Sequence, residues 1–228
     1  MEWNKKYSYP SSTRAIVYGS RHYSMDGFNL PSVTTILAAT KSEEDKAAIA
    51  AWKERVGHRE AERIKNEASS RGSSMHSYIE QFLLGKMNLD LLEEDNHSKR
   101  MAEEIIDSGL KDKLSEIWGA EATVYYPGKY AGTADCIGVY EGKNSLLDFK
   151  QSNKPKREEY IEDYFLQLGA YTLAHDIVHG TKMKAGVILL CTVDNLYQEF
   201  KIEGAELEMY QNLFLGRVKK FYEMSNTS

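Results

Sequence analysis

Alternation of apolar and polar residues predicts extended strands in the middle and second half of the chain. Residues 121–126 alternate, and two further stretches, 133–140 and 145–150, flank a turn-forming Glu-Gly-Lys-Asn sequence. Two later apolar stretches, 185–193 and 196–202, have the length and composition of strands. We therefore expect a strand, then a β-hairpin, and then two more strands.

Apolar residues at helical spacing predict helices before, between and after these strands. They are a short helix starting at Pro31-Ser32, one capped by Ser42, one following Gly72, and helices over 97–118, 158–179 and from Leu207 onward. A small hairpin, residues 15–23 with its turn at Gly19-Ser20, precedes them. This order predicts an α/β (α+β) fold in which a mixed central β-sheet is flanked by helices.

The length of the chain is compatible with a single domain made of two parts. Residues 1–118, approximately, would form the hairpin and a helical cover, and residues 119–228 the sheet with its flanking helices. The helical patterns also predict burial. We expect Trp52 in the core rather than as a base-stacking platform, and Phe165, Leu168 and Ile177 on the inward face of their helix.

One hairpin carries the candidate chemistry. With Gly142 and Lys143 as its two turn residues, Asp135 would lie opposite Lys150, and Asp148 would be its diagonal neighbour at roughly 7–8 Å. Asp148 and Lys150 share a face because they alternate along one strand, whereas the residues between them point into a core. Two carboxylates and an amine on one face suit metal-assisted phosphodiester cleavage. An ordinary ion pair between Asp135 and Lys150 fits the same pattern.

The acid-x-Lys triplet is not specific by itself, because residues 44–46, 141–143 and 199–201 repeat it. Only the triplet that begins at Asp148 combines an apolar strand with an acid on the preceding strand. Glu121, on a third strand, could support a metal there, but a solvent-facing position is the favoured interpretation.

Five separated motifs extend this pattern along the chain. They are LPSVTTIL at 30–37, RGSSMHSYIE at 71–80, GTAD at 132–135, DFKQ at 148–151 and QLGAY at 167–171. In type and order they resemble the RecB-like branch of the PD-(D/E)XK nuclease superfamily, and within it the exonucleases of the mitochondrial genome maintenance and phage types. The resemblance covers most of the chain, and it implies the mixed-sheet nuclease core and metal-dependent cleavage of DNA.

One or two Mg²⁺ or Mn²⁺ ions are expected at the hairpin, because these hard cations prefer oxygen ligands. The expected ligands are Asp135, Asp148, a main-chain carbonyl near Phe149, and His76. The resemblance implies that His76 lies beside the metal, whereas without the other motifs an ordinary helical contact between His76 and Glu80 is the preferred interpretation. Lys150 is expected to position or deprotonate the attacking water.

DNA contacts are expected around the same strands. The resemblance implies that Gln167 and Tyr171, four apart on one helix edge, border the active site and contact the nucleic-acid backbone. Lys154 and Arg157 supply local positive charge just after the second catalytic strand, and Gln151 belongs to the motif that ends there.

Composition limits the function class and the cofactors. The net charge of −5 excludes a generally basic DNA-coating protein, so DNA must meet a local basic surface. The two cysteines, Cys136 and Cys191, lie in apolar predicted strands and cannot supply the four ligands of an iron–sulfur cluster. We therefore expect no such cluster. Without a membrane-length apolar run, signal peptide or evident transit segment, we expect a cytoplasmic protein of a bacterium or phage-infected cell, neither secreted nor membrane-bound.

The acid–lysine pattern predicts a metal-dependent nuclease, and the resemblance implies an exonuclease that acts on single-stranded DNA ends in recombination, repair or replication. The strand would thread beneath a helical cover formed by residues 42–118. A single-strand-binding or recombination protein could be a partner. Three alternatives remain open: a structure-specific endonuclease of the same superfamily, a nucleic-acid-binding module that lost cleavage, and a scaffolding protein with a chance motif.

Overall fold

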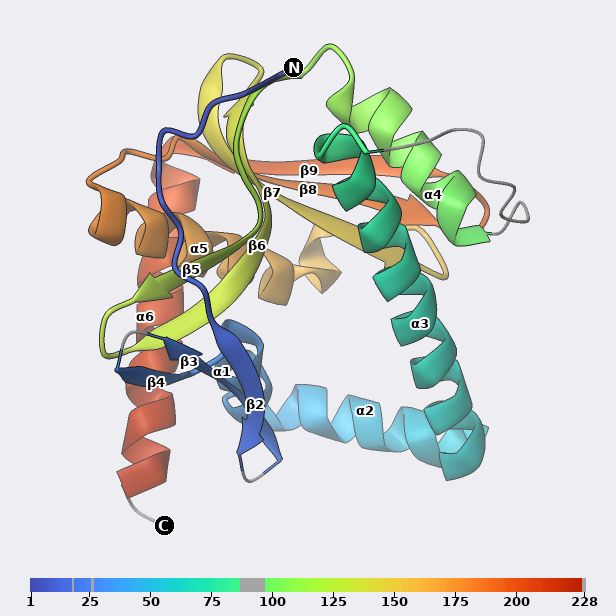
Figure 1. The fold of residues 1–228 in the computed structure, drawn as a ribbon. Coiled ribbons are helices and arrows are strands. Elements are labelled where there is room, and N and C mark those ends of the chain that lie inside the picture. The colour runs from blue at the N-terminus through green and yellow to red at the C-terminus, as the bar shows by residue number, and fades with distance from the viewer. Residues whose placement is uncertain (18, 26, 87–96, 227–228) are drawn as a thin grey trace.

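A six-stranded mixed sheet forms the centre of the computed structural model, which describes residues 1–17, 19–25, 27–86 and 97–226 (Figure 1). Its strands, in spatial order, are β1 (Glu2–Trp3), β5 (Leu114–Tyr126), β6 (Tyr130–Tyr140), β7 (Lys143–Ser152), β8 (Ala185–Thr192) and β9 (Tyr197–Glu203). Neighbours from β5 to β7 and the β8–β9 pair are antiparallel, whereas β7 pairs with β8, and β1 with β5, in parallel. The expected mixed sheet is therefore confirmed.

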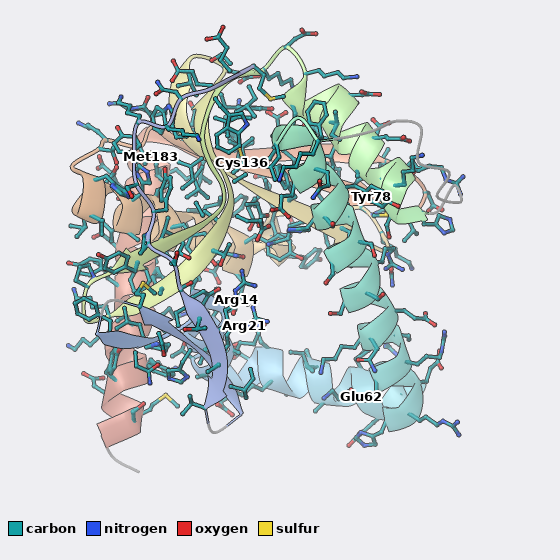
Figure 2. The ribbon with its side chains drawn as sticks, viewed as in Figure 1. Arg14, Arg21, Glu62, Tyr78, Cys136 and Met183 are labelled. Carbon is teal, nitrogen blue, oxygen red and sulfur yellow. The ribbon has the colours of Figure 1, made fainter. Side chains whose placement is uncertain are left out.

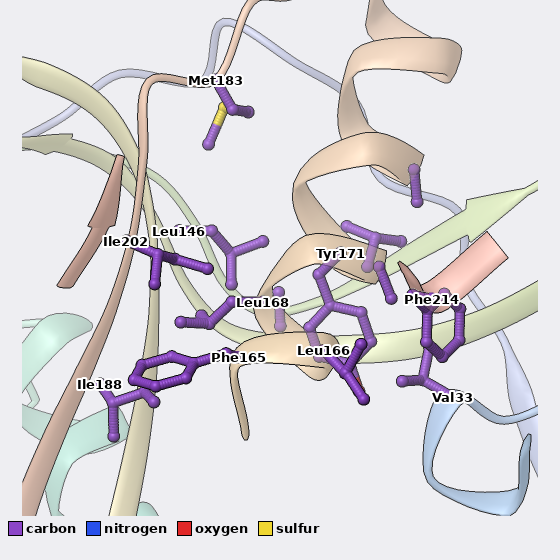
Figure 3. Packing of buried hydrophobic residues seen from close by; sticks show 14 of the residues in the cluster. Val33, Leu146, Phe165, Leu166, Leu168, Tyr171, Met183, Ile188, Ile202 and Phe214 are labelled. Carbon is purple, nitrogen blue, oxygen red and sulfur yellow. The ribbon is translucent and has the colours of Figure 1, made fainter. Parts of the chain in front are cut away.

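Helices cover both faces of this sheet, as the sequence predicted. On one face lie α1 (Val33–Ala39), α5 (Glu162–His179) and α6 (Gly204–Asn226), and on the other α3 (His58–Leu83), α4 (His97–Ile105) and a short π-helical segment (Ile106–Leu110). Alternation along β7 divides its side chains between two cores: Leu146 packs with the first layer, and Leu147 and Phe149 with the second. Figure 3 shows Phe165 and Leu168 of α5 packed near Ile188 of β8.

A small antiparallel sheet and an exposed helix come before α3 in the sequence. The small sheet consists of β2 (Thr13–Val17), β3 (Ser20–Met25) and β4 (Phe28–Pro31). The first two strands form the predicted hairpin, but Ser20 pairs with Val17 and belongs to β3, not to the turn, and Tyr18 lies outside the described residues. Ser32 caps α1 and Ser42 caps α2 (Glu43–Val56), each by accepting a backbone N–H three residues on.

The expectation that Trp52 belongs to the core was wrong. None of the residues of α2 is buried, Trp52 is only partly covered, and Ile49 is 43% exposed. Figure 1 explains the exposure: α2 runs from the small sheet to the far end of α3 and does not lie on the central sheet. Gly57, at φ 87°, turns the chain from α2 into α3, a conformation that glycine adopts without strain.

Two predicted helix boundaries were also wrong. Gly72 does not precede a helix but lies inside α3, which begins at His58. The helix expected over 97–118 ends near Leu110, and β5 starts at Leu114. Register shifts in β5, between Leu114 and Glu116 and between Ile117 and Gly119, interrupt the two-residue alternation of a strand. The spacing of its apolar residues therefore imitates a helix.

The helix expected over 158–179 divides into two elements. A 3₁₀ turn at Glu158–Tyr160 leads into α5, which ends at Gly180 in the left-handed conformation, as predicted. Phe165 and Leu168 are buried, but Ile177 is 50% exposed, so its inward assignment was wrong. In the part of the chain that the structure describes, no helix combines the length and the apolar character needed to cross a bilayer.

Candidate active site

The β6–β7 hairpin turns one residue earlier than the sequence suggested. Its turn residues are Glu141 and Gly142, at φ 47° and 75°, and Tyr140 pairs with Lys143. Positive φ at both central positions is the geometry that matches the twist of a two-residue hairpin. The prediction of Gly142 and Lys143 as the turn, with Asp135 opposite Lys150, was therefore wrong.

The corrected register leaves each side chain on its predicted face of the sheet but changes which residues of β6 and β7 lie opposite each other. Cys136 pairs with Leu147, so the next position of the same register places Asp135 opposite Asp148. Asp135 Oδ2 accepts a hydrogen bond from the Phe149 backbone N–H at 2.6 Å. The two aspartates therefore face each other across adjacent strands, closer than the predicted diagonal.

Glu121 joins this row from β5. In the β5–β6 register, Ala120 pairs with Cys136 and Ala122 with Ala134, so Glu121 lies opposite Asp135. Glu121 has φ 47°, a left-handed conformation uncommon for a residue with a side chain. Three carboxylates on three neighbouring strands, Glu121, Asp135 and Asp148, consequently form one line across the sheet.

The sequence interpretation favoured a solvent-facing Glu121, and the structure corrects it. A signal was available: the turn at Pro127-Gly128 fixes the pairing of Tyr126 with Tyr130, and counting back along that hairpin brings Glu121 opposite Asp135. The unusual φ of Glu121 could not be deduced from the sequence.

His76 approaches the carboxylates from α3. Its Nε2 lies 2.8 Å from the Phe149 carbonyl oxygen, and its Nδ1 lies 3.5 Å from Asp135 Oδ1 and 3.9 Å from Glu121 Oε1. One ligand atom from each of His76, Glu121 and Asp135 fits within 4.8 Å of the others. The helical histidine and the strand acids are thus brought together as predicted.

The charged groups of the site shift one another's pKa values. Burial opposes protonation of His76, but the Asp135 and Glu121 carboxylates raise its pKa to about 10. Burial likewise opposes ionisation of Asp135, yet His76, Lys150 and the Phe149 N–H lower the pKa of Asp135. Burial together with the Asp135 charge raises the pKa of Asp148 to about 6, although the Lys150 ammonium opposes that shift. Without a metal, His76 and Lys150 offset part of the negative charge of the three acids.

Lys150 is held by several partners. Its Nζ lies 2.5 Å from Asp148 Oδ2 and donates a hydrogen bond to Gln167 Oε1 at 3.2 Å. Gln167 Nε2 in turn donates to the Tyr171 hydroxyl at 3.2 Å, and the Tyr164 ring centroid lies 5.1 Å from Nζ. Burial opposes protonation of Lys150, but the neighbouring carboxylates raise its pKa. Lys150 is therefore a fixed, protonated ammonium.

Two of the sequence motifs meet at Tyr171. The side chain is 4% exposed, and a Cβ on Gly132 would lie 2.3 Å from its ring. Only glycine at position 132 leaves room for this tyrosine beside the strand that carries Asp135. Through Gln167, Tyr171 acts on the position of Lys150; a contact of Gln167 or Tyr171 with nucleic acid stays a prediction.

Gln151 connects β7 to α3. Its Oε1 accepts from Arg71 Nε at 2.8 Å, and its Nε2 donates to the Ala68 carbonyl at 2.9 Å. These bonds fix the helix that carries His76. Lys154 and Arg157 lie exposed beyond the end of β7, and Arg157 is 3.5 Å from Glu159. DNA binding by Gln151, Lys154 and Arg157 remains a prediction.

The residues present fit a divalent cation. Asp148 Oδ2 is buried, and its charged neighbour is Lys150 Nζ at 2.5 Å. With Asp135, Glu121, His76 and the Phe149 carbonyl nearby, the donor set is mainly oxygen, which suits Mg²⁺ or Mn²⁺.

Three curated relatives align with a large part of the chain, whereas no protein-family model matches it. Each is a mitochondrial genome maintenance exonuclease 1. The human protein is 27% identical over 205 residues, 85% of this chain; the mouse protein 31% over 176 residues, 73%; and the Xenopus tropicalis protein 29% over 191 residues, 77%. The chain spans only 58%, 51% and 52% of these relatives, respectively.

Solved structures give weaker likenesses. A candidate exonuclease from Eubacterium rectale aligns with a TM-score of 0.45 at 14% identity, over 69% of this chain and 68% of that one. An alkaline exonuclease from Laribacter hongkongensis aligns with a TM-score of 0.39 at 15% identity, over 86% and 91%. The sequence relatives give the more specific result: the chain is homologous to mitochondrial genome maintenance exonuclease 1, and its row of acids beside a lysine is consistent with a PD-(D/E)XK-like nuclease.

Proposed function

We propose that this protein is a divalent-metal-dependent DNA exonuclease that hydrolyses phosphodiester bonds from single-stranded ends. The observation that carries the proposal is the row of Glu121, Asp135 and Asp148 with Lys150 at its end. The names of the homologues, exonucleases of genome maintenance, support DNA as the substrate.

The acids, His76 and the Phe149 carbonyl would hold Mg²⁺ or Mn²⁺, as one or two ions. When bound, the cation supplies a water of lowered pKa and offsets negative charge on the reacting phosphate. His76 would have to be neutral to act as a ligand. Burial raises the pKa of Asp148 to about 6, and a cation held by this carboxylate would lower that pKa again.

Lys150 supplies fixed positive charge next to the acids. Its protonated Nζ can donate hydrogen bonds to a phosphate oxygen or to the attacking water, which orients that water and stabilises the charge of the transition state. Gln167 restricts Nζ to one direction, and Tyr171 fixes the Gln167 amide. We assign Lys150 to the reaction itself and Gln167 to positioning.

The exposed helices α2 and α3 are part of this proposal as a guide for a single strand. Helix α2 carries no buried residue and joins the small sheet to the far end of α3, so α2 and α3 project beyond the central sheet (Figure 1). We propose that a free strand end passes beneath these two helices to reach the acids. A requirement for an end follows from this arrangement.

The test compares linear and circular single-stranded DNA of one sequence, with Mg²⁺, Mn²⁺ or EDTA. Wild-type protein should degrade only the linear strand and only with metal, and Asp148→Asn should abolish degradation. Asp194→Asn, in the exposed turn after β8, is the matched control and should retain activity. Cleavage of the circle would indicate an endonuclease. Intact linear DNA with every metal would leave only binding.

A further inference from the structure

Two cavities meet at Arg14 and Glu121. The first, of about 340 Å³, lies beside His76 and is lined by α3 residues together with Arg14 and Glu121. The second, of about 470 Å³, lies between residues 3–12, here called the strap, and residues 119–123 of β5, with Arg14 and Glu121 again in its wall. We call the second one the strap cavity. It adjoins the candidate metal site and shares Glu121 with it, whereas His76, Asp135, Asp148 and Lys150 do not line it.

The walls of the strap cavity are fixed at both ends. Asn4 N donates to the Ile117 carbonyl at 2.9 Å, and the Ser12 and Thr123 hydroxyls are 2.8 Å apart. Between these attachments Tyr9 packs against β5 so closely that a Cβ on Gly119 would lie 2.7 Å from its ring.

Tyr9 also has a partner deeper in the fold. Its hydroxyl lies 3.0 Å from Nε2 of His175, which is buried in α5. The strap is therefore anchored to both the sheet and the first helical layer, so the open cavity beside it has fixed walls.

The side chains in the cavity wall match the three parts of a nucleotide. Trp3 is 40% exposed, and its indole N–H donates to the Leu83 carbonyl at 2.6 Å, which fixes the orientation of its ring. Ser11, Ser12 and Thr123 bring hydroxyls. A fixed aromatic ring can stack on a base, and hydroxyls can bond a sugar or a base edge. The volume is within the range of about 300–1,000 Å³ typical of small-molecule sites.

Arg14 provides the cation for a phosphate at the edge nearest the acids. Its side chain is 51% exposed, and Nη2 donates to Thr133 Oγ1 at 2.9 Å and lies 3.9 Å from Glu121 Oε2. The other carboxylate oxygen of Glu121 lies 3.9 Å from His76 Nδ1. Figure 2 shows Arg14 on the small sheet where it approaches β5 and β6. A phosphate bound by Arg14 would therefore lie directly beside a candidate metal ligand.

We propose that the strap cavity is a subsite for the nucleotide that flanks the cleaved phosphate, with its base against Trp3 and a phosphate at Arg14. This assignment rests on the proposed nuclease function. It gives the strap and Arg14 a role in substrate binding that the acid–lysine motif does not provide.

Binding can be measured without cleavage, by titrating the metal-free protein in EDTA with dTMP and following the heat released. Wild-type protein should bind dTMP more tightly than thymidine or inorganic phosphate, because only dTMP uses both the ring and the guanidinium. Trp3→Ala should weaken dTMP binding about five- to a hundredfold, the range given by base–aromatic stacking. Arg14→Met should weaken dTMP binding but leave thymidine binding unchanged.

Two variants serve as matched controls. Trp52→Ala removes a partly exposed tryptophan of α2, and Arg21→Met removes an exposed arginine of the same small sheet; neither residue lines the strap cavity. Both should bind dTMP like the wild type. Trp3→Phe keeps a ring and should restore most of the affinity, which separates stacking from misfolding. Equal dTMP binding by wild type, Trp3→Ala and Arg14→Met would overturn the proposal.

Cleavage assays distinguish this proposal from the function on which it rests. Trp3→Ala should raise KM for linear single-stranded DNA with little change in kcat, whereas Asp148→Asn should remove kcat. If wild-type protein cleaves DNA but substitution of Trp3 or Arg14 does not change its affinity for dTMP, the subsite proposal is wrong and the nuclease proposal still holds. Absent cleavage with dTMP binding that depends on both residues overturns the nuclease and leaves a nucleotide-binding site.

Discussion

Glu121 and Asp135 face each other across β5 and β6, and the same line continues to Asp148 on β7. Each acid alone is an ordinary strand residue. In register they concentrate negative charge within reach of one histidine and one lysine. Such an arrangement is costly unless cations compensate it, and this need for compensation underlies the predictions that follow.

Glu121 should contribute directly to metal affinity. Glu121→Gln keeps the size of the side chain but removes one of the three carboxylates. Loss of a residue that only supports a metal ligand lowers metal affinity about ten- to a hundredfold, so the loss of a ligand itself should lower Mn²⁺ affinity by at least that much. Isothermal titration with Mn²⁺ measures it. Glu62→Gln is the control, since Figure 2 shows Glu62 at the far end of α3. Unchanged Mn²⁺ affinity in Glu121→Gln would exclude this residue from the site.

Substitutions of Lys150 and Gln167 should lower kcat by different amounts. Lys150→Met should lower kcat about a hundredfold or more, as expected when a charged donor to the transition state is removed. Gln167→Ala leaves the Lys150 ammonium in place but removes the hydrogen bond that orients it. We therefore expect a smaller loss of kcat, with KM nearly unchanged. The activity of both variants on linear single-stranded DNA would be compared with that of Lys219→Met, which removes an exposed lysine of α6 and should retain activity. A variant with raised KM and normal kcat would instead indicate a DNA contact.

Gly132→Ala should destabilise the fold, because the new methyl group would overlap the Tyr171 ring. Overpacking of this kind costs typically about 1–3 kcal/mol of unfolding free energy. Gly216→Ala on α6, where nothing lies within 4 Å, is the control and should be neutral or stabilising by about 0.5–1 kcal/mol. Urea denaturation gives both values. Similar unfolding free energies for the two variants would contradict the packing described here.

Stability should decrease in mild acid because of His175. Burial, with help from His179, lowers the pKa of His175 to about 3, against a usual value of 6.5. Between these two values the unfolded chain binds a proton that the folded chain does not, so the free energy of unfolding falls as the pH falls from 6.5 towards 3. Stability is restored as the pH rises through that window.

Urea titrations at several pH values test this dependence. His175→Gln should be less stable at neutral pH, because its bonds to Tyr9 and Thr181 change, but its stability should depend less on pH between 6.5 and 3. His58→Gln, at the exposed start of α3, should follow the wild-type pH dependence. Equal slopes in all three proteins would show that His175 does not control acid stability.

Local patterns predicted most of the fold, and non-local geometry produced the errors. The alternation in β7 correctly assigned Leu147 and Phe149 to a core and Asp148 with Lys150 to the other face. The bulges of β5 could not be read from composition, because a register shift alters alternation without changing residue types.

The errors at Trp52 and Glu121 have a different origin. Helical spacing correctly predicted a helix around Trp52, but only the path of α2 away from the central sheet shows why Trp52 is not buried. Glu121 was assigned to solvent because most strand acids are exposed, whereas its position opposite Asp135 depends on pairing between two separate hairpin arms.

A crystal soaked in Mn²⁺ tests the central claim most directly, through the anomalous scattering of the metal. The account predicts an anomalous peak bounded by the carboxylates of Asp135, Asp148 and Glu121, lost in Asp148→Asn. Full Mn²⁺ occupancy elsewhere on the protein, with these three carboxylates free of metal, would contradict it.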